Sequence, residues 1–282
     1  MKSVVVTGAS TGIGWSCVKV LIAAGFRVFG GVRRQEDADR LSREFGARFA
    51  PLIFDVSDEA ATAAAAKQMK AALNGETLFG LVNNAGISIP GPLLYLGMED
   101  FKRQIEVSLV GQLVVTRAFA PLLGIDRTLK GPPGRIVMIS SVIGKTAFPL
   151  TGAYSAAKFG LEGMSESLRR ELMIFGVDVI IVAPGAVVTP IWEKANAVDV
   201  ARYDKTAYAS VLAQAKNYMM SVGKKGLPPE RIGEAVRIAL TVRRPKTRYT
   251  VAPNPIQTFL LANLPKRVVD AMIAGRLGLK KT

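Results

Sequence analysis

Residues 2–14, KSVVVTGASTGIG, decide the fold of this chain. The apolar, β-branched first half predicts a strand, and Gly8, Gly12 and Gly14 predict a tight turn into a helix. Glycines at such a turn let the backbone approach a pyrophosphate closely, and the N-terminus of the following helix favours its negative charge. A tight turn without a ligand is the alternative, but the strand-turn-helix setting favours nucleotide binding.

The same alternation of short apolar runs and longer amphipathic stretches continues along the chain. Strands are predicted at 2–7, 27–32, 49–54, 78–82, 135–140, 177–182 and 248–251. Helices are predicted at 12–24, 35–45, 58–73, 151–175 and 230–242, with one or two more within 99–123. Alternation with continuously apolar strands indicates an α/β fold, a doubly wound, mostly parallel seven-stranded sheet with helices on both faces.

Two segments break this rhythm. Residues 186–228 have a loose pattern, and we predict that they form a substrate-binding cap inserted into a single domain of residues 1–252. Residues 253–282 follow the last strand, contain three prolines, and are predicted to be a C-terminal extension. The aromatic residues of the cap are Trp192, Tyr203, Tyr208 and Tyr218.

The chain is strongly basic, with a formal net charge of +15. Residues 243–282 hold nine Lys or Arg and one acid, Asp270, a net charge of +8. This excess favours an anionic partner, either a lipid surface or a phosphorylated cofactor, or else reflects solvation alone. No nucleic-acid-binding module contains these residues, so nucleic acid is not expected. Residues 266–273 fit a helix lying on an anionic membrane, although covering the substrate pocket or a subunit interface is favoured.

The content of cysteine and of apolar runs bears on the compartment. A single cysteine, Cys17, excludes an internal disulfide, fits a reducing compartment, and is predicted to be a buried thiol. The start of the chain lacks the pattern of a secretory signal, and no run approaches 18 uninterrupted apolar residues. We therefore expect a cytoplasmic protein, with peripheral membrane contact as the alternative.

The pentapeptide Tyr154-Ser155-Ala156-Ala157-Lys158 predicts proton chemistry, with Ser141 thirteen residues before its tyrosine. Residues at i and i+4 share one face of a helix, so the ammonium of Lys158 can act on the phenol of Tyr154. The chain has no histidine, the usual proton carrier near neutral pH. A phenol has a pKa near 10, and a nearby ammonium is expected to lower it.

Together with Asn83-Asn84-Ala85-Gly86 and the Gly-x3-Gly-x-Gly spacing, this pentapeptide resembles the short-chain dehydrogenase/reductase family. The resemblance covers residues 2–190 and, more loosely, 230–252. The sequence as a whole looks like the steroid- and retinol-dehydrogenase-like branch of the family. It implies a Rossmann fold and an NAD(P)-dependent oxidoreductase. In that family the tyrosine is the general acid/base, the lysine assists it and holds the nicotinamide ribose, and the serine orients the substrate carbonyl. These roles fall on Tyr154, Lys158 and Ser141, with Ser140 as the alternative serine.

The resemblance also implies a cofactor site. Val32-Arg33-Arg34, where an acid would select NAD, favours NADP, although Thr11 stands where a basic residue is usual. Asp55-Val56 matches the adenine-contacting pair, with a plain turn as the alternative. In the segment that starts at Pro184, the backbone of Val187 and the hydroxyl of Thr189 would hold the carboxamide, with a generic turn as the alternative. The implied cofactor residues are Gly8, Ser10, Thr11, Gly12, Ile13, Gly14, Arg33, Arg34, Asp55, Val56, Asn83, Ala85, Gly86, Tyr154, Lys158, Pro184, Gly185, Val187 and Thr189; no metal site is expected.

Ser108 is a departure from the family pattern. The family commonly has an asparagine there, which is thought to shape a helix kink and support a proton relay to the lysine. A serine can bond back to a helix carbonyl and still permit a bend. We therefore place Ser108 with the catalytic residues and expect Ser108→Asn to preserve or raise turnover.

Apolar residues surround the predicted catalytic strand, among them Ile143, Phe148 and Pro149. They favour a lipophilic alcohol or its ketone or aldehyde as the substrate. A redox sensor that binds nucleotide without turnover and a membrane scaffold are the alternatives. By resemblance, a homodimer or homotetramer is expected through the long helices near 105–123 and 151–175.

Overall fold

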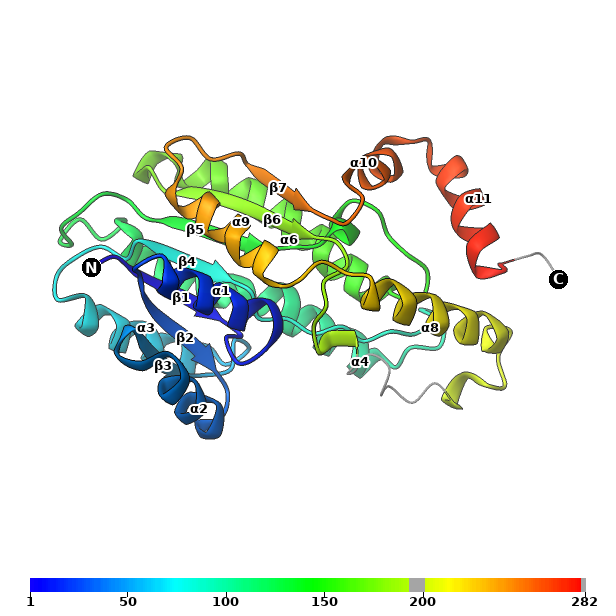
Figure 1. Ribbon diagram of the computed structural model, residues 1–282, viewed down its shortest axis with the longest axis horizontal. Coiled ribbons are helices and arrows are strands. Elements are labelled where there is room, and N and C mark those ends of the chain that lie inside the picture. Colours follow the sequence, from blue (N-terminus) through cyan, green and yellow to red (C-terminus); the bar gives the residue numbers. More distant parts are fainter. Residues whose placement is uncertain (193–200, 280–282) are drawn as a thin grey trace.

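The computed structural model describes residues 1–192 and 201–279. Part of the predicted cap, residues 193–200, and the end of the basic extension, residues 280–282, lie outside the described residues. Within the described residues the chain forms one sheet of seven parallel strands in the order β3-β2-β1-β4-β5-β6-β7 (Figure 1). The strands are β1 Ser3–Thr7, β2 Arg27–Val32, β3 Phe49–Ile53, β4 Gly80–Asn83, β5 Arg135–Ile139, β6 Asp178–Pro184 and β7 Arg248–Val251.

Helices cover both faces of this sheet, as the sequence pattern predicts (Figure 1). One core joins the sheet to α1, α2 and α9, and the other joins it to α3, α5 and α6. Their bounds are α1 Gly12–Ala23, α2 Gln35–Phe45, α3 Glu59–Leu73, α5 Gly111–Phe119, α6 Gly152–Glu171 and α9 Glu230–Thr241. The doubly wound Rossmann fold with its parallel seven-stranded sheet is therefore confirmed.

The strands are buried because both faces of the sheet are covered. All five residues of β1 are buried, and six of the seven residues of β6 are buried. Helices α1 and α9 pack closely, since a Cβ on Gly233 would lie 2.9 Å from the carbonyl oxygen of Ser16. Cys17 lies in this layer with no exposed surface, and burial raises the pKa of its thiol to about 12, so the predicted buried thiol is confirmed.

Parallel pairing brings the carboxyl ends of the strands to one edge of the sheet. Strand β1 lies between β2 and β4, and β5 lies between β4 and β6. The loops that follow these strands, at residues 8–11, 84–97, 140–151 and 185–192, therefore leave the sheet at this edge. Such an edge is where ligands bind in open α/β sheets.

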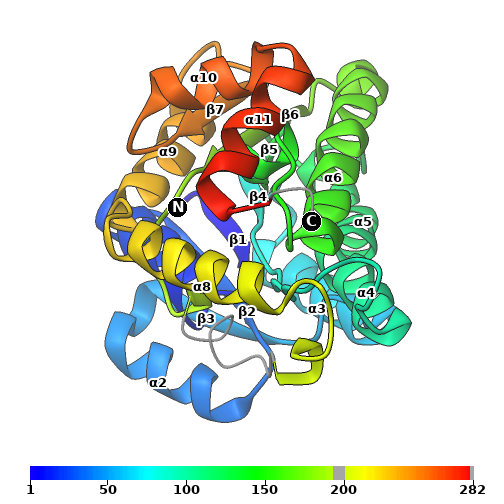
Figure 2. The ribbon, with the colours of Figure 1, turned by 90° about the vertical axis from the view of Figure 1, so that its right-hand side faces the viewer.

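The cap and the C-terminal extension are more regular than their sequences suggest. Helix α8 Ala209–Lys224 lies within the segment expected to be irregular, and the extension forms α10 Pro255–Asn263 and α11 Lys266–Leu277. Helix α11 buries one side against α8 at the carboxyl end of the sheet (Figure 2). This small third core stabilises both helices. Each helix alone has too few apolar residues to show a clear periodicity, because the buried cluster is formed by α8 and α11 together. Its buried members are Leu150, Tyr203, Val211, Leu212, Ala215, Val269, Ile273 and Leu277.

The predicted helical region 99–123 is one continuous run. It consists of α4 Met98–Ile105, the π-helical turn η2 Glu106–Val110, α5, and the 3-10 turn η3 Ala120–Leu123. Among the described residues, this is the run that is long and apolar enough to cross a membrane by length and composition. Half of its most apolar window is buried within the fold, where α5 packs in the second core, so we interpret it as a core helix.

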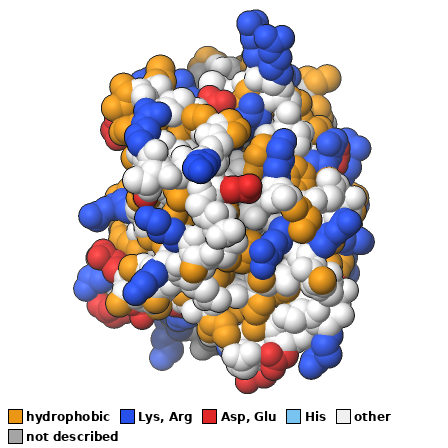
Figure 3. All heavy atoms as spheres, turned by 90° about the vertical axis from the view of Figure 1, so that its left-hand side faces the viewer, with side chains coloured by type: hydrophobic (Ala, Val, Ile, Leu, Met, Phe, Trp, Pro, Cys, Tyr) orange, Lys and Arg blue, Asp and Glu red, His pale blue; other side chains and the backbone are white. Residues whose placement is uncertain are grey.

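The positive charge is dispersed on the face at the amino end of the sheet. Figure 3 shows that Lys and Arg side chains outnumber acidic ones there and are interspersed with apolar side chains. Basic side chains spread in this way do not form one concentrated patch on this face.

Candidate active site

Tyr154, Lys158 and Ser141 lie together at the carboxyl end of β5. Tyr154 and Lys158 occupy the first two turns of α6, and the Lys158 Nζ atom lies 5.7 Å from the centroid of the Tyr154 ring. Lys158 is buried, and its Nζ donates a hydrogen bond of 2.8 Å to the carbonyl oxygen of Ile139, at the end of β5. Ser141 follows two residues later; its hydroxyl acts to lower the pKa of the Tyr154 phenol and donates a long hydrogen bond of 3.4 Å to the carbonyl oxygen of Pro184. The helical spacing thus places an ammonium, a phenol and a hydroxyl in one cluster.

Burial decides the charge states of this cluster. It lowers the pKa of Lys158 to about 8, and the negative charge of Glu162 opposes this by raising it. It also raises the pKa of Tyr154 above its ordinary value, against the lowering effect of the hydrogen bond with Ser141. The expected lowering of the phenol pKa is therefore wrong for the chain by itself, because desolvation of the phenolate outweighs its stabilisation. Burial therefore favours the protonated phenol of Tyr154, and it brings the pKa of Lys158 close to neutral pH.

The two adjacent serines point to different surroundings. The Ser141 hydroxyl accepts a hydrogen bond of 3.2 Å from the backbone N–H of Ile143, capping the 3-10 turn η4 Val142–Gly144. The Ser140 hydroxyl is buried without a hydrogen-bond partner, near Gly144 and Glu162 on the other side of the chain. Strand alternation accounts for this difference. The geometry therefore favours Ser141 over Ser140, as the sequence spacing does.

The glycine turn is a close-packed cradle ahead of α1. A Cβ on Gly14 would lie 2.1 Å from the carbonyl oxygen of Gly8, and Gly8 and Gly12 have positive φ angles of 64° and 59°. The first turn of α1 holds no acidic residue, and its N-cap residue, Thr11, makes no side-chain capping bond. The N–H groups at this helix start are therefore available to an anion, which is what a pyrophosphate requires.

Asn84, part of the recognised motif but not of the predicted site, braces the glycine turn. Its amide nitrogen donates to the carbonyl oxygens of Thr7 at 2.9 Å and Gly8 at 3.2 Å. The Thr7 hydroxyl in turn accepts from the backbone N–H groups of Asn84 and Ala85 at 2.9 and 3.0 Å. These bonds hold Ala85 and Gly86 next to the turn, where the sequence analysis places them.

Asn83 differs from its predicted role. Its side chain is buried, donates to the Thr116 hydroxyl at 2.8 Å, and faces the core between the sheet and α5. Side chains alternate along a strand, so Asn83 and Asn84 point to opposite sides. Any contact of Asn83 with a cofactor would therefore have to involve its backbone.

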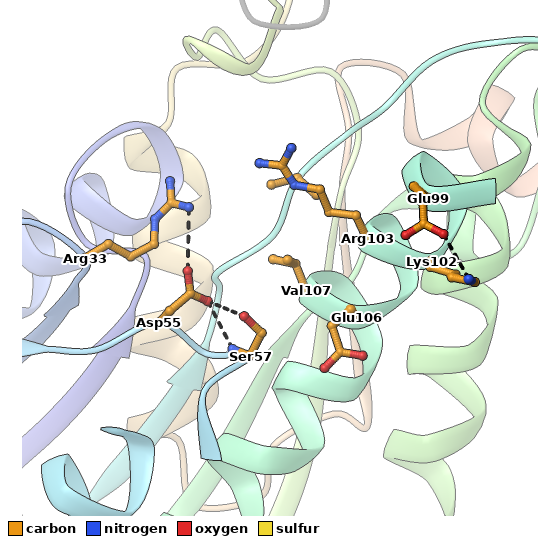
Figure 4. A pocket seen from close by; sticks show the side chains of 9 residues that line it. Arg33, Asp55, Ser57, Glu99, Lys102, Arg103, Glu106 and Val107 are labelled. Atoms are coloured by element: carbon orange, nitrogen blue, oxygen red, sulfur yellow. Dashed lines mark hydrogen bonds and ion pairs between the residues drawn. The ribbon is translucent and has the colours of Figure 1, made fainter. Parts of the chain in front are cut away.

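A pocket of about 350 Å³ lies beside the end of β2, where Arg33 and Asp55 meet (Figure 4). Arg33 forms an ion pair of 3.7 Å with Asp55, and Asp55 accepts from the backbone and hydroxyl of Ser57. These hydrogen bonds and Arg33 lower the pKa of Asp55 against its partial burial. Arg103, which sequence analysis did not predict here, extends from α4 toward the same pocket from the opposite side (Figure 4). Val56 is buried in the second core beside Gly111.

Helix α2 supplies cations around the same end of the site. Arg34 pairs with Asp37 at 3.5 Å, and the Arg40 guanidinium donates a bond of 2.7 Å to the carbonyl oxygen of Ser10. Arg40 thus brings positive charge to the glycine turn, where Thr11 stands in place of a basic residue. The role of Arg40 could not be predicted because this residue lies 30 positions after Ser10. It reaches the glycine turn only because α2 packs against β2 and β3.

The segment after β6 closes the other end of the site. The side chain of Thr189 lies next to the glycine turn, since a Cβ on Gly12 would be 3.3 Å from it. Val187 is buried and pairs with Leu227, and its carbonyl oxygen accepts a hydrogen bond of 2.7 Å from the indole of Trp192. Gly185 is tied to β7 through a bond of 2.8 Å from its N–H to the carbonyl oxygen of Val251.

Ser108 lies in the π-helical turn and is part of a buried polar network. Its hydroxyl accepts from the N–H of Ile87 at 3.2 Å and from the amide of Gln104 at 2.9 Å. Gln104 also donates to the carbonyl oxygen of Ile87 and accepts from the N–H of Ile89, both at 2.8 Å. Gln104 and Ser108 together therefore hold the loop after β4. Sequence analysis missed Gln104, whose one signal is a polar residue four positions before Ser108 on an otherwise buried helix face.

This arrangement fits a dinucleotide. The cradle at Gly8 to Gly14 would hold the pyrophosphate of the dinucleotide. The Arg33–Asp55 pocket would hold one ribose and its base, and Lys158 and Thr189 would hold the other nucleoside. Tyr154 stands there as a proton donor, and no histidine is needed. The chemistry that these residues allow is proton transfer at a carbonyl or alcohol beside a bound nucleotide.

Comparisons with known proteins agree with this geometry. Residues 2–199 match the family model described as short chain dehydrogenase. The chain is 34% identical to an NADPH-dependent 3-dehydrocapnine reductase of Ornithobacterium rhinotracheale, over 96% of this chain and 95% of the reductase. It is also 34% identical to mouse retinol dehydrogenase 5, over 95% of this chain and 86% of that enzyme.

Solved structures give the same answer. A short-chain dehydrogenase from Streptomyces avermitilis aligns with a TM-score of 0.75 and 26% identity, over 99% of this chain and 96% of that one. A serine dehydrogenase in complex with NADP⁺ aligns with a TM-score of 0.70 and 26% identity, over 89% and 94%. This chain is an oxidoreductase of the short-chain dehydrogenase family, in its retinol- and steroid-dehydrogenase-like branch.

Proposed function

We propose that this protein is an NADPH-dependent reductase that converts a lipophilic ketone or aldehyde to its alcohol, with Tyr154 as the proton donor. The observation that carries the proposal is the cluster of Tyr154, Ser141 and Lys158. A protonated phenol with a serine hydroxyl and a buried ammonium beside it can give a proton to a carbonyl oxygen.

The residues divide the work as follows. The nicotinamide, when bound, supplies hydride chemistry. Ser141 hydrogen-bonds the carbonyl oxygen and holds it next to the phenol. Tyr154 donates its proton to that oxygen as negative charge develops on it. Lys158, anchored on Ile139, stabilises the resulting phenolate with its charge. A protonated Tyr154 is the form that reduction requires, and burial favours this form.

The preference for NADP rests on three guanidinium groups. Arg40 bonds to the glycine turn at Ser10, Arg33 lies beside Asp55 and Arg34 beside Asp37, and guanidinium binds phosphate in bidentate fashion. The description of one relative as NADPH-dependent supports this assignment. Replacing Arg33 and Arg40 with Gln should raise the KM for NADPH much more than that for NADH. Arg43→Gln, an exposed change on the same helix, is the matched control.

A lipophilic substrate fits the lining of the carboxyl end of the sheet. Phe148 stacks on Tyr218 of α8 with ring centroids 6.0 Å apart, and Tyr95 meets Tyr208 edge-on at 5.9 Å. The exposed side chains of Leu93 and Leu94 lie in the loop before α4. The printed name of the mouse relative, a retinol dehydrogenase, names a substrate of this class.

The test is NADPH oxidation against a panel of lipophilic ketones and aldehydes. Turnover should occur with wild type and disappear with Tyr154→Phe, while NADPH binding measured by fluorescence persists in both. If NADPH binds but none of the panel is turned over, the redox-sensor interpretation replaces the enzyme. If Tyr154→Phe keeps full turnover, the assigned proton donor is wrong.

Assembly and location are further parts of the proposal. Phe159 on α6 and Leu113 on α5 are 45% and 36% exposed, which supports a homodimer or homotetramer through these helices. Light scattering of wild type and Phe159→Glu measures this directly. A cytoplasmic protein with peripheral contact to an anionic membrane is supported by α10, where Ile256 and Phe259 are 73% and 66% exposed near Lys266 and Arg267. Liposome flotation of Ile256→Ser/Phe259→Ser against wild type tests that contact without removing α11.

A further inference from the structure

A buried ion pair lies one helical turn beyond Lys158, and the proposed mechanism does not use it. Glu162 follows Lys158 by four residues on α6, so their side chains share one face of the helix. Arg248 of β7 donates from its Nε to both Glu162 carboxylate oxygens, at 3.2 and 3.0 Å, and from Nη2 at 3.1 Å. The side chains of Glu162 and Arg248 are 9% and 18% exposed. Of the ion pairs in the described part of the chain, this one is the most buried.

The same guanidinium reaches the serine of the candidate active site. Arg248 Nη2 donates a long bond of 3.5 Å to the carbonyl oxygen of Ser141, and Nη1 donates to the hydroxyl of Thr250. Arg248 therefore links strand β7 to helix α6, through Glu162, and to the backbone of Ser141. A movement of the guanidinium would displace both Ser141 and the helix that bears Tyr154.

Titratable groups near Lys158 come from two elements of the described structure. On α6 itself they are Tyr154 and Glu162, and β7 contributes Arg248 through its ion pair with Glu162. Lys145, after η4, lines a small cavity with Glu162 and Arg248, as do Glu166 and Arg169 farther along α6. β5 contributes the uncharged carbonyl oxygen of Ile139. Glu162 is the negative charge that acts on Lys158, raising its pKa against the effect of burial.

We propose that Glu162 and Arg248 are positioning residues of the active site: Arg248 holds Ser141 and α6 in place, and it sets how strongly the charge of Glu162 acts on Lys158. The inference rests on the proposed function of Lys158 as the ammonium that serves the cofactor ribose and Tyr154. It adds two residues that neither the family motifs nor the sequence analysis includes.

The charges predict opposite effects for the two partners. Glu162→Gln removes the carboxylate, so Lys158 loses its proton at lower pH. Arg248→Gln removes the cation that neutralises Glu162, so Lys158 keeps its proton to higher pH. A single neighbouring charge shifts a pKa by about 1 unit or more, which is about tenfold in the charged fraction above the midpoint. A role in stability alone would weaken the fold in both variants and leave the pH dependence unchanged.

The experiment measures NADPH affinity by nicotinamide fluorescence between pH 6 and 10, the range about the ordinary lysine value, so that it requires no turnover. Wild type should lose affinity as pH rises past about 8, where Lys158 loses its proton. The midpoint of that loss should move down by about 1 pH unit in Glu162→Gln and up in Arg248→Gln. The same two shifts should appear in kcat/KM for any substrate found. Glu166→Gln, whose partner Arg170 lies in an exposed pair on the same helix, is the matched control and should behave as wild type.

A double variant keeps the test usable if either single variant fails to fold. Glu162→Gln/Arg248→Gln removes both charges at similar volume, and its midpoint should lie above that of Glu162→Gln and below that of Arg248→Gln, because the two effects oppose one another. Single-variant midpoints that stay at the wild-type value, or that both move in the same direction, would overturn the proposal. If wild type itself binds NADPH but turns over no substrate, the proposed reaction fails while the binding midpoints still test this inference.

Discussion

Replacing Gln104 with Leu should separate the fold from the function of the loop after β4. The Gln104 amide makes three hydrogen bonds that Leu cannot make: to the carbonyl oxygen of Ile87, from the N–H of Ile89, and to the hydroxyl of Ser108. Gln104 and Ser108 have no exposed surface, whereas Ile87 and Ile89 are partly exposed. Water can therefore replace the bonds to the loop more easily than the bond to Ser108.

The magnitude follows from that difference. A buried polar group that loses its partner costs about 1–3 kcal/mol, and a bond that water can replace costs about 0.5–1.5 kcal/mol. The extra apolar burial of Leu offsets part of this, so we expect a loss of about 2–4 kcal/mol in the free energy of unfolding. At about 2–4 °C per kcal/mol for a chain of this size, Tm should fall by roughly 4–16 °C. Because Ala85 and Gly86 precede the loosened loop, NADPH affinity should fall as well.

The assay compares thermal unfolding and NADPH binding of wild type, Gln104→Leu and a control. Gln68→Leu makes the same chemical change at an exposed position of α3 and should leave both quantities unchanged. The reasoning is refuted if Gln104→Leu melts within about 1 °C of wild type, since about 2 kcal/mol would then be missing. It is also refuted if stability falls but NADPH binds with unchanged affinity, because the loop would then not depend on Gln104.

Four other changes test neighbouring parts of the site. Gly14→Ala should weaken nucleotide binding by about tenfold or more, because the new Cβ would lie 2.1 Å from the Gly8 carbonyl oxygen; unchanged affinity by fluorescence would contradict the cradle. Because the pKa of Lys158 is about 8, kcat/KM for reduction should decline above pH 8 as the ammonium is lost, and a profile that stays flat to about pH 10 would count against a charged Lys158. Cys17, fully buried with a pKa of about 12, should resist alkylation in the native protein and react after denaturation, as measured by mass spectrometry; rapid native labelling would show that α1 opens. Ser108→Asn should preserve or raise turnover, because a polar side chain remains beside Gln104 and the N–H of Ile87, and a collapse of activity in a folded variant would contradict this role.

Local patterns predict most of this fold because each strand and each helix on its two faces has its own apolar signal. The strands at 27–32 and 248–251 and the helix at 35–45 match the structure residue for residue, and other predicted bounds differ by one or a few residues. Helices α8 and α10 were not predicted. The apolar residues of α8 become a buried face only when α11, fifty residues later, packs against it. The sequence of α8 alone therefore shows no clear helical periodicity of apolar residues from which the helix could be predicted.

The site shows the same division. The cluster of Tyr154, Lys158 and Ser141 could be predicted, because helix spacing and one strand end bring it together. Arg40, Gln104 and Arg248 could not be predicted, since each reaches the site across a packing interface from a distant part of the chain. The charge state of Tyr154 was predicted wrongly for a related reason. Sequence gives the neighbouring ammonium, but the desolvation that outweighs it depends on how α6 packs against β5.

A chain without histidine must tune a phenol by its surroundings, and two buried polar pairs hold the elements around the candidate site. Gln104 and Ser108 hold the loop after β4, and Glu162 and Arg248 hold α6 and the backbone of Ser141. Lys158 lies on the same helix as Glu162 and is fixed to the carbonyl oxygen of Ile139 by one hydrogen bond. Its pKa of about 8 leaves it charged at neutral pH by a small margin, so the loss of one neighbouring negative charge would leave only roughly half of it charged there. The groups that set this margin therefore matter as much to the proposed proton transfer as the three residues that perform it.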